Sequence, residues 1–582
     1  MNEVLIRSAF KRFVSKMTLN NLMVFSGPVV NGIVISRYLG TDAMAAYQIV
    51  LPLMFVVMMF SQIISLGVQN NCAKSLGAGR EEDAREYYSA AIIFALPISL
   101  LLVFVVFEWA EVIVALLGAN GAAANLAFDA AEFLKGFSFG IPLLLILPMQ
   151  IAVFFLEGRA KCAIRAIFAQ TTVNIVGAFA NALYLEGGMF GMVLLMTVCY
   201  FVSFCIMVEE NRESCIRFVL RPLRRRWILP VLRIGLPSAI DRFYKSTQMF
   251  VINRVLLLVA PGAAIAAFAD INALNNIFNP IVMGLSATTL TMAGVFTGEH
   301  DKNSLHALLR IAVKDSLMVT LPVALLTTLA APQIIGMFVT KEGEAFNTAV
   351  RALSIYIWYL PLYAVNNVLQ KYYLGINAMK MTYLTSLLDN FLFVCLLSTV
   401  LGYCFGADGV WFSFVLAEIL TIAALALFIA WRNGKFPRRI ADFLCLPQGF
   451  EEALLKPFAQ SAVNMKEVVE VSEGARQYLL ANGVSSKEAM FMALCIEETG
   501  NNIIRWGFED GKSHSIDILV FKEETWSMRI RDDCKPFDLK KWLEIHRDDD
   551  RASNIGIRTI CGIAREVRYS RTLDLNYLLI RL

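Results

Sequence analysis

The chain has 582 residues, of which 57% are hydrophobic and only 17% are charged, and its formal net charge is +4. So much apolar surface excludes an ordinary water-soluble fold over most of the chain. The basic residues border apolar segments and form no patch interleaved with aromatic residues, so the charge indicates membrane topology and excludes nucleic-acid binding.

Long apolar stretches alternate with short polar loops up to residue 435. A helix needs about 20 residues to cross roughly 30 Å of hydrocarbon. Stretches of about this length lie near 17–39, 46–72, 88–107, 133–156, 164–185, 189–208, 232–259, 264–296, 311–339, 352–375, 381–403 and 408–431. We therefore predict an all-α polytopic bundle of about twelve transmembrane helices in residues 1–435, surrounded by the lipid bilayer.

Basic residues gather in every second loop between these stretches. One such loop carries Lys74, Arg80 and Arg85, whereas the loops at 41–45 and 261–264 contain no Lys or Arg. Because basic loops stay in the cytoplasm, this pattern predicts a multi-pass protein of a bacterial cytoplasmic (inner) membrane with both termini in the cytoplasm. The basic first 16 residues lack a small-residue cleavage site and are predicted to be retained.

The bundle reads as two copies, about 10–210 and 230–432. The first copy contains TyrLeuGly at 38–40 and AlaAlaTyr at 45–47, and the second contains the similar ProGly at 261–262 and AlaAlaPhe at 266–268. Further along, Gly77 of the first copy corresponds to Gly298 of the second at the same spacing. Parallel copies are a plan of transporters, in which a central cavity lies between two lobes. A duplicated channel or membrane enzyme would leave the same pattern, so the repeat favours transport without deciding it.

Several short motifs of the bundle occur together in one known family. They are TyrLeuGlyThrAspAlaMetAlaAla at 38–46, LeuGlyAlaGly at 76–79, LeuGluGlyArgAlaLys at 156–161, IleGlyLeuPro at 234–237 and PheGlyAlaAspGlyValTrp at 405–411. In this order the segment from about 10 to 435 resembles the multidrug and toxic compound extrusion (MATE) transporters. The resemblance implies an antiporter that exports bulky organic compounds and takes H+ or Na+ as its coupling ion.

Many members of that family couple through carboxylates in the N-terminal lobe, and here this chain departs from the pattern. It has Asn31 where relatives often have Asp in the first span, and Ala178 where some have Asp four residues after the position of Asn174. An ionised carboxylate in low dielectric is costly and therefore responds to protons. Coupling through a carboxylate would have to use the C-terminal lobe.

The C-terminal lobe has four acidic residues within its predicted spans. Asp241 has Arg242 beside it and Lys245 one turn on, so a structural ion pair and a coupling role are both open. Asp389 and Glu418 have no partner that the sequence identifies. Asp270 is the fourth.

Amide side chains accompany these acids. Asp270 is followed by Asn272, Asn275, Asn276 and Asn279 on one helical face, where amides either line a cavity or bond neighbouring helices. Asn366, with Asn367 and Gln370 nearby, is a comparable cavity candidate.

A linker over 436–455 leads to a tail, 456–582, with the composition of a soluble α+β domain. Periodicity predicts helices at 464–482 and 486–508, a hairpin of strands at 513–522 and 526–532, and a last strand at 573–582.

In the second of these helices Glu498 and Asn502 are four residues apart and face the same side. AspAspCysLysProPheAsp at 532–538 and AsnIleGlyIle at 554–557 follow in that order. This succession resembles the histidine-kinase-like ATPase fold, and most closely the anti-sigma-factor serine kinases. The resemblance implies an ATP site in which Asn502 holds Mg2+, Glu498 is the catalytic base, Asp532 accepts from adenine and Gly556 lies near phosphate. Two positions depart from the family's motifs. Cys534 stands where Gly is usual, and the last glycine-rich motif begins with Asn554 and Ile555 and so contains a single glycine, Gly556. An ATPase, a serine or threonine kinase, and binding without chemistry all remain open.

Two functions fit the whole sequence. One is an exporter of a small organic substrate with a nucleotide-binding regulatory tail. The other is a membrane sensor, in which an uncoupled transporter-like bundle signals through a kinase-like tail to a cytoplasmic regulatory protein. Loss of the N-lobe acids favours the sensor, whereas the repeat and the cavity amides favour the exporter.

Overall fold

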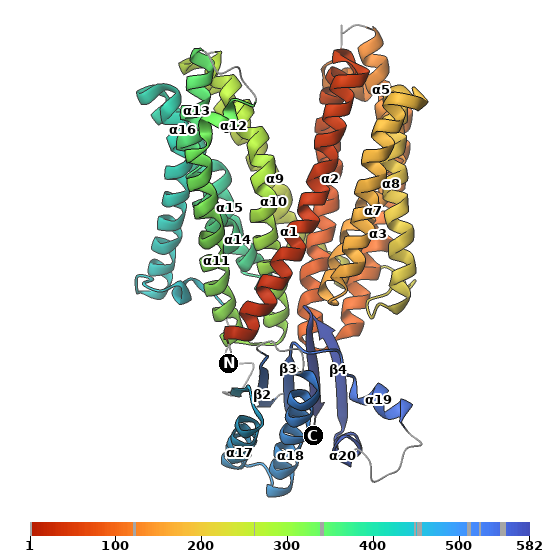
Figure 1. Ribbon diagram of the computed structural model, residues 1–582, viewed down its shortest axis with the longest axis vertical. Coiled ribbons are helices and arrows are strands. Elements are labelled where there is room, and N and C mark those ends of the chain that lie inside the picture. The colour runs from red at the N-terminus through yellow and green to blue at the C-terminus, as the bar shows by residue number, and fades with distance from the viewer. Residues whose placement is uncertain are drawn as a thin grey trace.

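The chain folds into a long helical bundle with a small α+β tail beneath it (Figure 1). The computed structural model describes residues 3–119, 124–260, 262–337, 343–446, 450, 457–508, 514–522, 525–546 and 555–581. We call α1 to α8 the N half of the bundle and α9 to α16 the C half.

The N half consists of long apolar helices joined by tight turns. Its elements are α1 (Glu3–Val34), η1 (Ile35–Leu39), α2 (Thr41–Gly77), α3 (Glu81–Glu108), α4 (Ala110–Val114), η2 (Ala115–Ala119), α5 (Ala124–Ser138), α6 (Ile141–Leu156), α7 (Ala160–Ala180), η3 (Asn181–Leu185), α8 (Gly188–Glu210) and η4 (Asn211–Glu213). The LeuGlyAlaGly motif ends α2, where Gly79 takes a φ of 69° and turns the chain toward α3.

The C half also consists of long helices, and its helical run has two interior irregularities. Its elements are α9 (Arg225–Val259), α10 (Ala263–Gly298), α11 (Lys302–Leu329), α12 (Ala331–Ile335), α13 (Glu344–Tyr356), α14 (Tyr359–Gly375), α15 (Met379–Leu387), η5 (Leu388–Leu392) and α16 (Phe393–Asn433), followed by the short η6 (Ile440–Phe443). Helix α16 is broken at Gly406 (φ 63°, ψ −146°), between the last two predicted spans. The π-helical turn η5 interrupts the helical run from α15 to α16.

The polytopic membrane bundle is confirmed, but the number of about twelve spans is not. Among the described residues, seven helical segments are long and apolar enough to cross a membrane. Two bent pairs, α5 with α6 and α13 with α14, raise this number to nine. Helices α9 and α11 are long but carry charged residues such as Arg233 and Arg310, and they are not among the nine.

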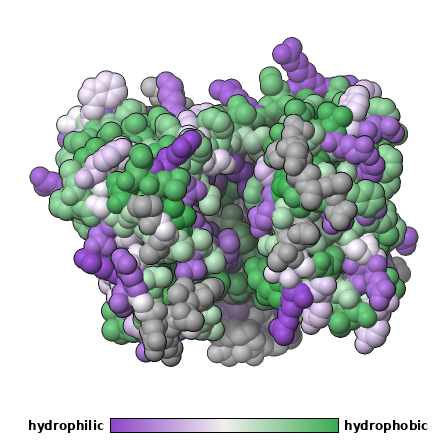
Figure 2. Space-filling model, turned by 90° about the horizontal axis from the view of Figure 1, so that it is seen from above, coloured by the Kyte–Doolittle hydropathy of each residue, from purple (hydrophilic) through white to green (hydrophobic). Residues whose placement is uncertain are grey.

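The two halves separate at the end far from the tail and meet at the tail-side end (Figure 1). Seen from the far end, a hollow lies between the halves (Figure 2). At the tail-side end α2 packs against α9 and α10. There Gln69 donates to the hydroxyl of Thr291 (2.6 Å) and Asn70 donates to the carbonyl of Leu374 (3.1 Å). The bundle is therefore closed on the tail side and open on the far side.

Gly77 and Gly298, which correspond in the predicted repeat, lie at this closed end. A Cβ atom on Gly77 would lie 2.0 Å from the carbonyl oxygen of Val295, and one on Gly298 would lie 2.0 Å from that of Lys74. Any larger residue would force α2 and α10 apart, so both positions require glycine. The repeat itself stays a prediction.

The tail is a five-stranded antiparallel sheet with helices on one face. Its elements are β1 (Phe458–Ala462), α17 (Met465–Ala481), α18 (Ser486–Gly507), β2 (Ile516–Lys522), β3 (Trp526–Asp532), α19 (Leu539–Ile545), α20 (Ile555–Ile563), β4 (Glu566–Thr572) and β5 (Leu575–Arg581). The strand order is β1-β2-β3-β5-β4. The predicted helices, hairpin and last strand are confirmed, whereas β1, β4, α19 and α20 were not predicted.

The two faces of the sheet have different neighbours. Along β3, Met528 and Ile530 belong to the core beneath α17 and α18. Successive side chains of a strand alternate between faces, so Arg529 and Arg531 point the other way, toward the bundle. On β5, Tyr577 belongs to the core of the bundle. The tail is therefore docked through the sheet face that its own helices leave open.

Candidate functional site

Two carboxyl groups lie in contact among the helices of the C half. Asp389 belongs to the π-helical turn η5 and Glu418 to α16, and their side chains are 5% and 1% exposed and lie next to each other. Asn366 of α14 donates to Glu418 Oε2 (2.6 Å). From the sequence, Asp389 and Glu418 had no identifiable partner, and Asn366 was a separate cavity candidate. The structure brings these three side chains together. π-Helical turns of this kind occur frequently at functional sites.

Asp241 has different partners from those expected. Its Oδ1 accepts from Gln370 (2.8 Å) and Asn390 (3.0 Å), and also from Ser386. The nearest cation is Lys371, with Nζ 3.9 Å from Oδ2. The cation that pairs with Asp241 is thus Lys371 of α14 and not Lys245 on its own helix, and the choice between an ion pair and a coupling role stays open.

Lys245 instead points to a group of tyrosines. Its Nζ donates to the hydroxyl of Tyr363 (2.8 Å), which also accepts from Asn367 (3.2 Å). Tyr363 stacks on Tyr359 with ring centres 4.9 Å apart. This polar and aromatic wall continues from the carboxyl pair along α14.

The predicted amide stripe of α10 is joined to the bundle at one point. Asn275 donates to the hydroxyl of Tyr356 (2.8 Å). Asp270 is partly buried, and within the described part of the chain it forms neither a hydrogen bond nor an ion pair. The structure does not bring Asp270 together with Asp389 or Asp241.

The N half has Asn31 and Ala178 at the two positions where the resemblance led us to expect acids, and Asn174 lies one turn before Ala178. Asn31 of α1 and Asn174 of α7 are buried, and α1 packs against α7. The Oδ1 atoms of both accept no hydrogen bond from the described residues.

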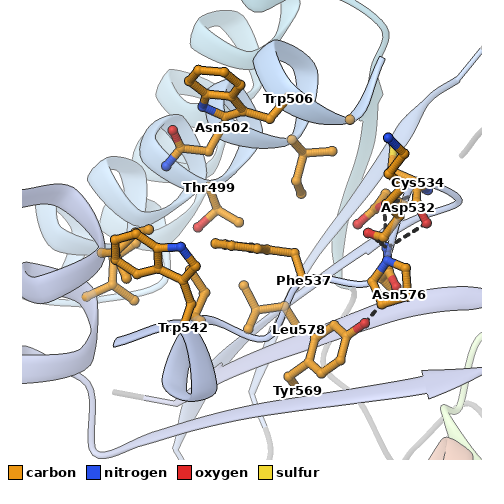
Figure 3. A pocket seen from close by; sticks show the side chains of 17 residues that line it. Thr499, Asn502, Trp506, Asp532, Cys534, Phe537, Trp542, Tyr569, Asn576 and Leu578 are labelled. Atoms are coloured by element: carbon orange, nitrogen blue, oxygen red, sulfur yellow. Dashed lines mark hydrogen bonds between the residues drawn. The ribbon is translucent and has the colours of Figure 1, made fainter. Parts of the chain in front are cut away.

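The tail contains a cavity of about 410 Å³ between α18, α19 and strands β3 to β5. Its lining mixes aromatic and polar side chains, as Figure 3 shows: Thr499, Asn502, Trp506, Asp532, Cys534, Phe537, Trp542, Tyr569, Asn576 and Leu578. The buried hydroxyl of Thr499 has no hydrogen-bond partner among the described residues. A buried unpartnered hydroxyl on the wall of a cavity is the kind of group that a ligand satisfies.

Asp532 is fixed in this wall by a chain of hydrogen bonds. Asn576 and the backbone N–H of Cys534 donate to its Oδ1 (2.8 and 2.9 Å), and Tyr569 donates to Asn576 (2.8 Å). Burial raises the pKa of Asp532, while these donors oppose the shift. Asn576, Tyr569 and the aromatic residues were missed from the sequence, because they come from elements that only the fold brings together.

The four residues implied by the ATPase resemblance fall into two pairs. Asn502 and Asp532 line the cavity. Glu498 and Gly556 lie beside the cavity and in contact with each other. A Cβ atom added to Gly556 would lie 2.1 Å from Glu498 Oε2. Asn554, in the predicted phosphate box, lies outside the described residues.

One group of potential metal ligands lies behind the cavity. Ligand atoms of His514, Asp533 and Cys534 lie within 4.8 Å of one another. Asp533 accepts from Arg12 (3.1 Å) and lies 2.8 Å from His514 Nδ1. These bonds already account for Asp533, so the arrangement is that of a hydrogen-bonded cluster.

Comparison with known proteins matches the bundle. A family model described as MatE matches residues 17–180 and 237–403, more than half of the chain. A curated relative, "Probable multidrug resistance protein YoeA" of Bacillus subtilis (strain 168), is 20% identical over 362 residues, which is 60% of this chain and 76% of the relative.

Solved structures share the same fold. "Crystal structure of MATE in complex with MaD3S" has a TM-score of 0.68 at 19% identity, covering 74% of this chain and 96% of the other. A Pyrococcus furiosus transporter, titled "Reverse polarity of binding pocket suggests different function of a MOP superfamily transporter", has a TM-score of 0.67 at 20% identity and the same coverage. The family match ends at residue 403, before the tail.

Proposed function

Because the chain belongs to the MatE family, we propose that it is an antiporter that exports organic or drug-like compounds across the cytoplasmic membrane. The Bacillus subtilis relative is named a probable multidrug resistance protein, which supports drug-like compounds as the substrate class. In this arrangement the tail-side end faces the cytoplasm, and the hollow in Figure 2 opens to the outside.

The observation that carries the proposal is the carboxyl pair of Asp389 and Glu418. Two carboxyl groups that lie next to each other inside the membrane are costly if both are ionised, so one of them would hold a proton. Loss of that proton would place two negative charges side by side and push Asp389 away from the part of α16 that carries Glu418. This movement would couple proton flow to the shape of the C half. H+ is the coupling ion that this pair favours over Na+.

The test is flux of a lipophilic organic cation in vesicles that contain the purified full-length protein, driven by a pH gradient. We expect Asp389→Asn and Glu418→Gln to remove the dependence on the gradient. Asp408→Asn is the matched control, because Asp408 lies on the same helix but pairs with Arg351 at 2.6 Å, away from the pair. Gradient-driven flux at the wild-type rate in both variants would exclude coupling through this pair.

The tail is proposed to bind Mg-ATP and to regulate transport. The cavity offers an aromatic lining for a flat base, a fixed carboxylate at Asp532 and the unpartnered hydroxyl of Thr499. Asn502 would hold Mg2+, whose charge offsets that of the phosphates. Glu498 and Gly556 lie together one helical turn away, where a reacting phosphate would be placed.

Binding is tested by calorimetric titration of the full-length protein with ATP, with and without Mg2+. Asp532→Ala should weaken every adenine nucleotide, whereas Asn502→Ala should weaken only the Mg2+-dependent part. Glu498→Ala should leave the affinity nearly intact and remove any hydrolysis, because a general base stabilises the reacting state more than the bound substrate. A folded protein that gives no heat at millimolar ATP would exclude the nucleotide site.

A membrane sensor is the second candidate, favoured by the neutral Asn31 and Ala178 in the N half and by the docked tail. It predicts that the vesicles show no gradient-driven flux of the organic cation, while the same compound changes ATP binding by the tail. A cytoplasmic regulatory protein would then be the partner of the tail.

A further inference from the structure

The tail touches both halves of the bundle through a single sheet. On the C-half side, Arg531 Nη1 lies 3.2 Å from Glu299 Oε2, and Arg529 Nη2 lies 3.3 Å from Asp301 Oδ2. Glu299 and Asp301 form the turn between α10 and α11. Arg531 is only 1% exposed and also bonds Asp517 of β2 (3.1 Å), so this contact is fully withdrawn from water.

On the N-half side, the contacts come from β4, β5 and the turn between them. The backbone N–H of Leu573 donates to the carbonyl of Leu156 at the end of α6 (3.1 Å). Asp574 pairs with Lys16 of α1, and Arg568 donates to the carbonyl of Gly79 between α2 and α3. Three separate segments of the N half are thus held by one hairpin.

These contacts all lie at the end where the two halves meet. A transporter that alternates by rocking must separate this end to open toward the cytoplasm. One sheet cannot follow both halves when they separate, because β5 is bonded to β3 residue by residue through Arg531 and Tyr577. Separation therefore has to break either the hairpin contacts or the buried arginine contacts.

We propose that the open face of the tail sheet is a brace, which holds the cytoplasmic ends of the two halves together and favours the outward-open form. This inference rests on the proposed transport by rocking of the two halves. It does not require that ATP binds in the tail cavity. The arginine contacts to Glu299 and Asp301 fix it to the C half, and the β4–β5 hairpin fixes it to the N half. Release of either side frees the cytoplasmic ends to separate.

The ATP cavity lies on the opposite face of the same strand. Asp532 lines the cavity, while its neighbours Arg531 and Asp533 bond Glu299 and Arg12 of the bundle. A ligand that moves Asp532 therefore moves two bundle contacts with it. Binding of a ligand in the cavity would therefore change how strongly the brace holds the two halves together.

The experiment measures the distance between the two cytoplasmic ends by single-molecule energy transfer in the full-length protein. Dyes are attached through non-canonical amino acids at the exposed positions Lys161 of α7 and Asn303 of α11, so that the native cysteines stay. Lys16→Asp repels Asp574 and weakens the N-half side of the brace. Lys16→Asp combined with Asp574→Lys restores the pair with its charges exchanged.

Lys11→Asp is the matched control, because it makes the same charge reversal on α1 at an exposed residue that pairs with no acid among the described residues. We expect Lys16→Asp to raise the population with separated ends at least threefold, the exchanged pair to return it toward wild type, and Lys11→Asp to change nothing.

A second variant, Glu299→Gln with Asp301→Asn, weakens the C-half side and should also raise the separated population. Unchanged distances in both Lys16→Asp and this variant, in folded protein, would overturn the brace. Flux is recorded separately, so a chain that transports nothing but shows the expected distances would contradict the proposed function and leave the brace standing.

Discussion

Two regions of this molecule bury several carboxyl groups, and they neutralise them differently. In the C half, Asp389 and Glu418 lie next to each other and Asn366 donates to Glu418, but neither acid forms an ion pair among the described residues. At the docking face, Glu299 and Asp301 are each held by the guanidinium groups of Arg529 and Arg531. The second cluster therefore has fixed cations in contact with its acids, whereas the proposed function gives that place to a proton in the first.

The difference teaches which cluster can respond to a proton gradient. Arginine stays charged at every physiological pH, so the positive side of the docking contact is fixed. Burial raises the pKa of Glu299, and the two arginines oppose that shift. A carboxyl pair held by a proton and amides changes its charge when the proton leaves. Three substitutions separate the two kinds of cluster by the size of their effects on stability, and a fourth tests the tail cavity.

Arg531→Ala should have the largest effect on stability. It leaves Glu299, Asp301 and Asp517 buried with too little positive charge, and removing one member of a buried ionic cluster costs about 3–5 kcal/mol. Thermal unfolding of the full-length protein measures this loss. Arg476→Ala is the control, because its pair with Glu473 lies at the surface, where water screens the attraction and the pair contributes little to stability. Equal shifts for the two variants would contradict the importance of burial.

Glu299→Gln should cost about 1.5–3 kcal/mol, the range for hydrogen bonds to charged groups. The amide keeps the shape of the side chain but loses the attraction of Arg529 and Arg531. Chemical unfolding followed by the fluorescence of Trp526 or Trp542 in the tail reports this change. A loss as small as that of Glu418→Gln would remove the distinction between the two clusters.

Asp532→Ala should weaken ATP binding about tenfold, or about 1.4 kcal/mol. Because burial raises the pKa of Asp532, the carboxylate becomes protonated at a higher pH than an ordinary aspartate. The protonated form cannot accept from adenine in the same way, so affinity should fall as the pH is lowered toward that raised pKa. Asp532→Asn should bind weakly at every pH, and a wild-type affinity independent of pH would exclude the ionised acceptor.

Glu418→Gln should have the smallest effect on stability, less than about 1 kcal/mol, because glutamine resembles the protonated carboxyl that the proposed function requires in this pair. Its effect on coupling should nevertheless be complete. Thermal unfolding and gradient-driven flux are measured on the same sample. A large loss of stability would show that Glu418 is ionised and held by a cation.

Sequence patterns predicted a helix or strand well where a capping residue or a regular spacing of apolar residues marks it. The side chains of Asn464 and Ser485 accept from the backbone N–H groups of Glu467 and Glu488, and the two tail helices begin there as predicted. Strand β4 was missed because it alternates charged and apolar residues over a half-buried face. The number of spans stayed uncertain because α9 and α11 carry charges inside the bundle.

Partners of polar side chains were harder to predict than elements. Lys245 is one helical turn from Asp241, yet Lys371 of α14 is the cation beside that carboxylate. Glu418 and Asn366 were each identified as candidates, but only the packing of α14 against α16 shows that they bond. Spacing within one helix cannot reveal a neighbour on another helix.

The sequence by itself determined that this chain is a polytopic membrane bundle of the MatE type with an α+β tail, because apolar length, basic loops and short motifs are local properties. The tertiary structure decided that Asp389 meets Glu418, and that Arg529 and Arg531 turn away from the tail's own core to bind Glu299 and Asp301. These contacts join residues as far apart as 232 positions, and a buried charge finds its partner only when the whole chain has packed.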